Sequence, residues 1–95
     1  MLTIKEIVTD TYTNSSGYSL YQELKVYLAA KKPVTLSFKG VSSTSSSFLN
    51  SSFGSLIEEF GLPVFTSFVK PVDISAAEAD IIRKYISGFR QQSSR

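Results

Sequence analysis

The sequence predicts a small α/β domain in which three helices pack on a mainly parallel sheet of three or four strands. Strand-like and helix-like segments alternate in the order β-α-β-α-β-α, and helices between consecutive strands imply crossover connections. The hydrophobic content of 42% is typical of a folded chain. A length of 95 residues suits one core, so we expect a single domain over 1–91 and a frayed tail over 92–95.

Three segments have the apolar patterns of strands. In 2–8 apolar residues first alternate with polar ones, and in 34–38 three apolar residues share one face with small residues on the other. The segment 64–69 is mostly β-branched or aromatic, and we predict that it forms the third strand. The polar stretch 11–17 is predicted to be a loop, or a ragged strand followed by a turn.

Three other segments carry apolar residues at the spacing of a helical face. The first, 19–31, begins with the capping-box pattern S-L-Y-Q and ends before Pro33. The second covers 49–60 and is followed by a Gly and, two residues later, a Pro. The third, 76–91, follows the capping-box pattern S-A-A-E.

Residues that could carry catalytic chemistry are scarce. The chain has no Cys and no His, which removes disulfides, thiolates, the commonest general base and the commonest transition-metal ligand. No G-x-S-x-G motif activates a serine. Asp73, Glu78 and Asp80 lie around a predicted helix start, where carboxylates favour the helix dipole. We therefore predict no enzyme, and no catalytic, cofactor-binding or metal-ligating residue.

Charge and hydropathy limit the partners and the location. Ten basic and eight acidic residues give a net charge of +2, and their interleaving argues against nucleic acid as a partner. No apolar run is long enough to span a bilayer, and the N-terminus lacks the pattern of a signal peptide. We expect a cytoplasmic protein without membrane contact. A homodimer stays open, because so few strands leave a face of the sheet uncovered.

The most unusual segment is the serine-rich turn Ser42–Ser47, hereafter the serine loop, where a strand end meets a helix start. Eight serines and Thr44 lie between Ser42 and Ser55. Two interpretations remain open. Serines are good turn and N-cap residues, which needs no function. In the second interpretation, the loop is a recognition surface with a phosphorylatable serine, because free N–H groups at a helix start favour anions.

The strand-turn V-T-L-S-F-K-G-V (34–41), followed by S-S-S-F (45–48) and an amphipathic helix, resembles the STAS-like domain family. These small bacterial domains are related to anti-sigma factor antagonists, and the resemblance covers 14–86. The antagonists have an Asp-Ser-Ser/Thr-Gly turn whose first Ser is phosphorylated by a kinase with the histidine-kinase-type ATPase fold. The resemblance implies that Ser46 matches this phosphoacceptor. Ser45 and Phe48 replace the Asp and the Gly, and Ser37 replaces a strand-end Asp.

We therefore predict a regulatory protein–protein interaction module with a STAS-like fold. Its partner would be a histidine-kinase-type ATPase, docked through the segment that contains the serine loop. The predicted phosphoacceptor is Ser46, and the predicted partner-binding residues are Ser45, Ser47, Phe48 and Asn50. The alternative is a small phage- or host-encoded protein that binds nucleic acid or a host factor.

Overall fold

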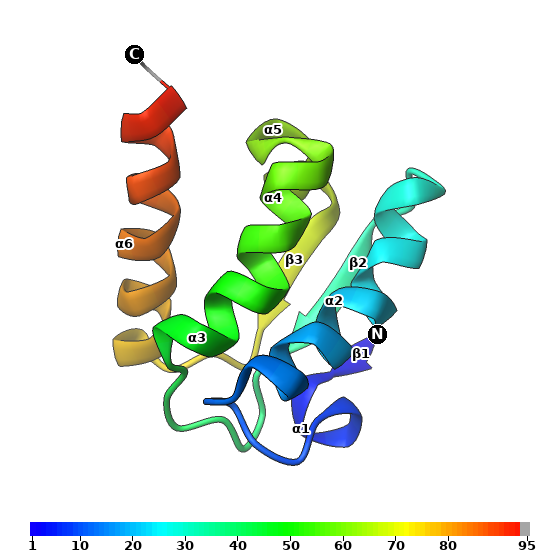
Figure 1. The fold of residues 1–95 in the computed structure, drawn as a ribbon. Coiled ribbons are helices and arrows are strands. Elements are labelled where there is room, and N and C mark those ends of the chain that lie inside the picture. The colour runs from blue at the N-terminus through cyan, green and yellow to red at the C-terminus, as the bar shows by residue number, and fades with distance from the viewer. Residues whose placement is uncertain (94–95) are drawn as a thin grey trace.

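The computed structural model describes the backbone of residues 1–93 and the side chains of residues 1–89. Segments α3, η1 and α4 follow one another without a break and form one helix with a π-helical middle (Figure 1). The elements in chain order are β1 (Leu2–Thr3), α1 (Ile4–Ile7), α2 (Asn14–Ala29), β2 (Val34–Ser37), α3 (Ser46–Leu49), η1 (Asn50–Gly54), α4 (Ser55–Phe60), α5 (Leu62–Phe68), β3 (Val69–Val72) and α6 (Ala76–Ser93).

The sheet has three parallel strands in the order β1-β2-β3, which confirms the predicted fold class. Strand β2 is central, with Leu36 opposite Leu2 on one side and Pro71 on the other. Figure 1 shows α2, α4 and α6 next to one another, with β2 and β3 behind α2 and α4. β1 and β3 are therefore the edge strands, and the β1 pairing covers only two residues.

The core lies between the sheet and the helices. The side chains of Val34 and Leu36 on β2, and of Phe38 directly after it, are buried, as the alternation in 34–38 predicts. The helices supply the other large buried groups, among them Leu24 from α2 and Phe48 from α3. On the second face of β2, Thr35 is half-buried and Ser37 is buried, so this face of the strand carries small polar side chains.

Two strand predictions are wrong in part. The segment 2–8 is extended only at Leu2–Thr3, and the chain then turns into the short helix α1, which buries Ile4. The segment 64–69 is mostly the helix α5, and β3 begins only at its last residue, Val69. Pro63 lies in the first turn of α5, where proline favours a helix start, and a short apolar run alone does not separate a strand from a helix.

The helix predicted at 19–31 begins five residues earlier, so its predicted capping box is wrong. The N-cap is Thr13, whose hydroxyl accepts a hydrogen bond from the Ser16 amide at 3.3 Å. Ser19 lies inside α2 and donates to the carbonyl of Ser15 at 3.2 Å. The predicted loop over 11–17 is therefore correct only up to Thr13. A threonine caps a helix as readily as a serine does, and the polar first turn of α2 concealed the start.

The other two helices differ from prediction mainly at their ends. The helix predicted over 49–60 begins at Ser46, and α6 extends to Ser93, two residues past its predicted end at 91. Residues 94–95 of the predicted tail lie outside the described residues. Half of the second capping box is confirmed, because the hydroxyl of Ser75 accepts a hydrogen bond from the Glu78 amide at 3.1 Å. None of the helices within 1–93 is long and apolar enough to cross a membrane.

Candidate functional site

The serine loop lies at the carboxyl edge of the parallel sheet, where the segments that follow the three strands meet. In open parallel sheets this edge is the usual position of binding sites. The segment before α2 contacts the serine loop through Thr11 and Tyr12, and the first turn of α6 contacts it through Glu78. Two segments that are distant in sequence therefore converge on one short loop.

Three hydrogen bonds tie the serine loop to the segment before α2. The hydroxyl of Thr11 donates to the carbonyl of Ser43 at 2.5 Å, and the amide of Ser45 donates to the carbonyl of Thr11 at 3.1 Å. The hydroxyl of Ser45 donates to the carbonyl of Tyr12 at 2.8 Å. The Asp10 carboxylate accepts from the amides of Tyr12 and Thr13, and these bonds lower the pKa of Asp10.

Ser45 is the N-cap of the helix that follows the loop. Its hydroxyl accepts a hydrogen bond from the amide of Phe48 at 3.1 Å, and its backbone is extended (φ −90°, ψ 164°). The same hydroxyl also donates to Tyr12, so both of its hydrogen-bonding roles are in use. The interpretation of the serines as capping residues therefore holds for Ser45.

Ser46 and Ser47 occupy the first turn of α3 and are exposed. Among the described residues, neither hydroxyl has a hydrogen-bond partner, whereas the backbone carbonyl of Ser47 accepts from Ser51 at 2.9 Å. These two side chains are thus the hydroxyls of the helix start that meet solvent. Ser46 directly follows the capping residue and lies beside the free N–H groups of the helix start.

Phe48 does not belong to the exposed surface of the loop. Its ring is fully buried in the core, so the prediction of Phe48 as a partner contact does not fit its side chain. Its backbone carbonyl accepts hydrogen bonds from the hydroxyls of Ser51 (3.3 Å) and Ser52 (2.7 Å). A large apolar side chain at this position anchors the helix start, which a glycine in the related turn would not do.

Asn50 is exposed and begins the π-helical segment, but its side chain is already engaged. Its amide oxygen accepts a hydrogen bond from the hydroxyl of Tyr85 on α6 at 2.7 Å. Burial, with a smaller contribution from the charge of Glu58, raises the pKa of Tyr85 to about 12. The phenol is therefore protonated over the physiological range and serves as a donor. Asn50 therefore connects the helix that follows the serine loop to α6.

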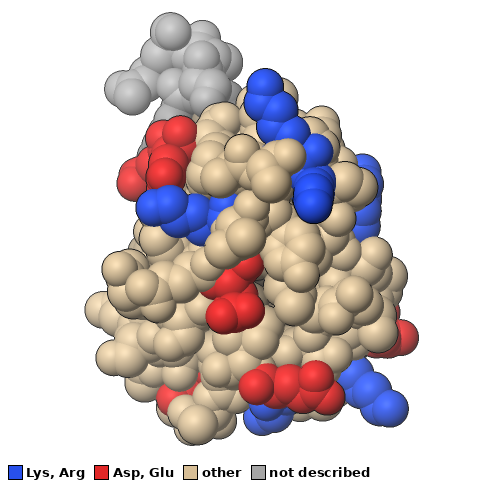
Figure 2. Space-filling view, turned by 90° about the vertical axis from the view of Figure 1, so that its right-hand side faces the viewer, with Lys and Arg blue, Asp and Glu red and all other residues tan. Residues whose placement is uncertain are grey.

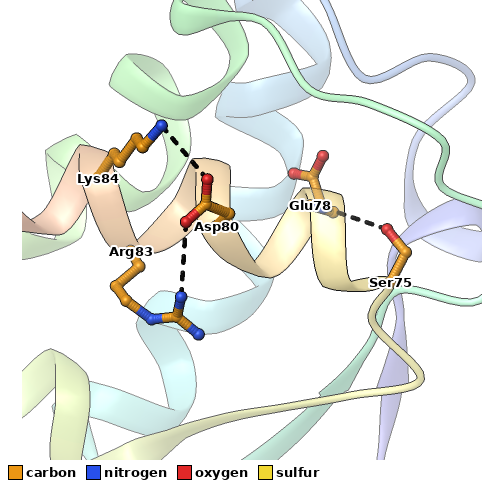
Figure 3. Close-up of polar contacts among 5 residues, drawn as sticks. All are labelled: Ser75, Glu78, Asp80, Arg83 and Lys84. Atoms are coloured by element: carbon orange, nitrogen blue, oxygen red, sulfur yellow. Dashed lines mark hydrogen bonds and ion pairs between the residues drawn. The ribbon is translucent and has the colours of Figure 1, made fainter.

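Glu78 is the functional-site residue that the sequence interpretation missed. Its carboxylate is fully buried, and one oxygen accepts a hydrogen bond from the Thr44 hydroxyl at 2.6 Å. The other oxygen, Oε1, has no hydrogen-bond partner in the described structure. Figure 3 shows Glu78 apart from Asp80, which pairs with Arg83 at 3.6 Å and Lys84 at 3.3 Å. The carboxylate thus links α6 to the serine loop and does more than favour the dipole of its own helix.

A second link joins the ends of β2 and β3. The hydroxyl of Ser37 donates to the Asp73 carboxylate at 2.8 Å and accepts from the amide of Lys39 at 3.2 Å. Asp73 has a positive φ of 54°, so the chain turns sharply there. Ser37 thus holds a carboxylate at this edge by binding Asp73, the residue that follows β3.

The charges on the α2 side of the molecule are mixed. Figure 2 shows red and blue atoms side by side at the upper left and at the bottom, and several blue groups at the upper right of a mostly uncharged surface. Lys25 pairs with Glu59 at 3.5 Å and lies 5.4 Å from the ring centre of Tyr21. A hydrogen bond from Tyr21 to Glu59 raises the pKa of Tyr21.

Residues 16–77 match the sequence profile of a family described as a STAS-like domain of unknown function (DUF4325). The matched segment runs from the first turn of α2 to the first turn of α6 and contains the whole serine loop. No significant match was found among curated proteins or solved structures.

Proposed function

Because the chain belongs to the family of STAS-like domains of unknown function, we propose that it is a non-enzymatic regulatory module that binds a protein partner through the serine loop. The proposed partner is a cytoplasmic bacterial ATPase of the histidine-kinase type. Ser46 is the proposed phosphoacceptor, and phosphorylation of Ser46 would switch the complex. Ser47 and Asn50 are the proposed partner contacts, because both are exposed.

The observation that carries this proposal is the contrast between Ser46 and its neighbour. The hydroxyl of Ser45 is used twice within the fold, whereas that of Ser46 is exposed and has no partner in the described structure. A kinase needs such a free and accessible hydroxyl. The helix start keeps its cap when Ser46 is modified, because the cap is the side chain of Ser45.

The electrostatics of the helix start support a phosphate at Ser46. A phosphate adds up to about −2 of charge, and negative charge near a helix N-terminus is favourable. The helix that begins at Ser46 runs without a break to Phe60. The modification would therefore leave the fold intact while it changes the charge and the shape that a docked partner meets.

Affinity purification from the native host tests this proposal. Tagged wild-type chain is compared with Ser46→Ala, Ser46→Asp and the control Ser67→Asp, which adds the same charge on the exposed face of α5. We expect wild type and Ser67→Asp to retain an ATPase of this type, and Ser46→Asp to lose it. Mass spectrometry after incubation of the purified pair with ATP should find phosphate on Ser46 in wild type, while Ser46→Ala should lack it.

Two results would contradict the proposal. If Ser46→Asp retained every partner as well as wild type does, phosphorylation of Ser46 could not act as the switch. If nucleic acid were the main partner and the loop stayed unmodified, the alternative class of function would replace the proposed one. A steep fall of that binding with salt would then identify phosphate contacts.

A further inference from the structure

An apolar pocket of about 190 Å³ lies between the sheet, α5 and α6. The strand register places Leu36 of β2 beside Pro71 of β3, so both side chains lie on the face of the sheet that borders the pocket. Helix α5 contributes Phe65, η1 contributes Phe53 and α6 contributes Ile82. The walls therefore come from the sheet and from the helices that cover it.

The pocket has a buried floor and an open mouth. The side chains of Phe53 and Ile82 are buried and belong to the floor. Thr66 and Pro71 are exposed and Ile86 is half-buried, so these three residues lie where the pocket meets solvent. A small molecule can therefore enter from this side without unfolding of the core.

The walls carry no group that would pair with a charge. Among the described lining residues none has a charged side chain, and only Thr66 has a polar one. The hydroxyl of Thr66 already donates to the carbonyls of Leu62 at 3.1 Å and Pro63 at 3.2 Å in its own helix. A charged ligand would lose its hydration in this pocket without gaining a partner, so the walls favour a neutral and apolar one.

Three phenyl rings in the floor favour an aromatic ligand. The ring centre of Phe53 lies 6.4 Å from that of Phe38, in an edge-on arrangement, and 5.1 Å from that of Phe65, with the planes tilted. All three rings line the pocket. Aromatic rings prefer such edge and offset contacts with one another, so a further ring can extend this cluster.

The volume of the pocket sets the size of the ligand. Engineered apolar cavities of about 150 Å³ stay dry and bind benzene. The present pocket is somewhat larger, so it accommodates one ring with a short substituent. It is smaller than the pockets that hold drug-sized ligands, which begin at about 300 Å³.

We propose that this pocket binds a neutral molecule with a single aromatic ring, which packs against the phenyl rings of the floor. Burial of the ligand's apolar surface supplies the affinity. The uncharged walls supply the discrimination, because they reject ligands whose ring carries an ionised group. No described lining residue belongs to the serine loop, so the site does not depend on the function proposed for that loop.

Methyl NMR of the full chain tests the site, with Leu36 and Ile82 as reporters from the floor. The probes are toluene, the anion benzoate and the cation benzylamine. We expect toluene to shift both methyl signals and to bind at least about tenfold more tightly than either charged probe, because neither charge finds a partner in the pocket.

A matched pair of variants on α6 places the binding in the pocket. Ile86→Phe enlarges a side chain that lines the mouth, so it should fill part of the pocket and abolish toluene binding. Ile81→Phe makes the same change at an exposed position outside the described lining residues and should retain the binding. The comparison of the three probes uses the wild-type chain, so it remains decisive if Ile86→Phe does not fold.

Four results would overturn the proposal. The first is the absence of shifts at Leu36 and Ile82 with millimolar toluene. The second is equal affinity for toluene and benzoate. The third is equal toluene binding in Ile86→Phe and Ile81→Phe. The fourth is movement of both methyl signals when the ligand-free protein is diluted, which would make a second copy of the chain the occupant of the pocket.

Discussion

The central helix formed by α3, η1 and α4 lies between α2 and α6 (Figure 1), and these two interfaces are built differently. Against α2 the backbones approach closely at Gly17: a methyl group there would lie 2.5 Å from the carbonyl oxygen of Phe48 and even closer to the hydroxyl of Ser51. Against α6 one polar pair joins Asn50 to Tyr85, and Ile82 of α6 is buried in the core. A pocket of about 190 Å³, lined by Phe53, Ile82 and Ile86 among others, is left beside this contact.

The difference shows that one layer of helices can combine a rigid and a loosely filled interface. Close backbone contact leaves no space to adjust, so α2 fixes the position of the helix that carries the serine loop. At the α6 interface, apolar burial is incomplete, and a side-chain hydrogen bond adds to the packing of Ile82, Tyr85 and Ile86. We therefore expect substitutions at the α2 interface to have the larger effect on stability.

The largest effect is expected for Gly17→Ala. The added methyl group meets the backbone of Phe48, which cannot move without shifting the helix start, so the free energy of unfolding should fall by about 2–3 kcal/mol. Urea denaturation followed by circular dichroism measures this change. The control is Gly88→Ala on α6, where a methyl group meets nothing within 4 Å and better helix propensity should add about 0.5–1 kcal/mol. Equal behaviour of the two variants would contradict a tight α2 interface.

The second effect concerns the tie between the serine loop and α6. Thr44→Val keeps the shape of the side chain but removes the hydrogen-bond donor from the buried Glu78 carboxylate, whose other oxygen is already unpaired. The free energy of unfolding should fall by about 1–3 kcal/mol. Thr9→Val, at an exposed position, is the control and should change it by less than about 0.5 kcal/mol. If Thr44→Val left the free energy of unfolding unchanged, water would have replaced the lost donor.

A smaller effect on stability is expected at Gly54, where the central helix meets Tyr85 of α6. A methyl group on Gly54 collides with the hydroxyl of Tyr85, which is the end of a side chain that can shift. Gly54→Ala should therefore cost only about 1–1.5 kcal/mol. Because Tyr85→Phe removes the colliding atom, the double variant should be less destabilised than the sum of the two single variants. Additive effects in this double-mutant cycle would show that the hydroxyl is not the obstacle.

The smallest effect is a loss of folding stability at high pH. The folded-state pKa of Tyr85 is about 12, above the value near 10 of an unfolded tyrosine. The stability that comes from its protonated form is thus complete below pH 10 and is lost as the pH rises through 12. Unfolding free energies measured from pH 9 to 12 should fall less steeply in Tyr85→Phe than in wild type. If the unfolding free energy fell equally steeply with pH in both proteins, deprotonation of Tyr85 would not contribute to the loss of stability.

The sequence predicts the order of elements and the central strand because those depend on local periodicity. It fails at 64–69, where an apolar run without a clear period becomes α5, and at the start of α2, where Thr13 caps the helix instead of Ser19. In the site, the sequence predicts that serines can cap the helix but not that Ser45 is the cap, because the helix begins at Ser46 and not at 49. The burial of Glu78 does not, because it depends on Thr44, a residue 34 positions away.

The two edges of the sheet also limit how this protein can assemble. One edge offers only the two residues of β1, and the other contains Lys70 and Pro71 in β3. Proline has no N–H to donate, and a lysine on an edge strand opposes the addition of another strand. The sheet is consequently protected from growth by strand pairing, so a second copy or a partner would have to bind through side chains on the helical or polar surfaces.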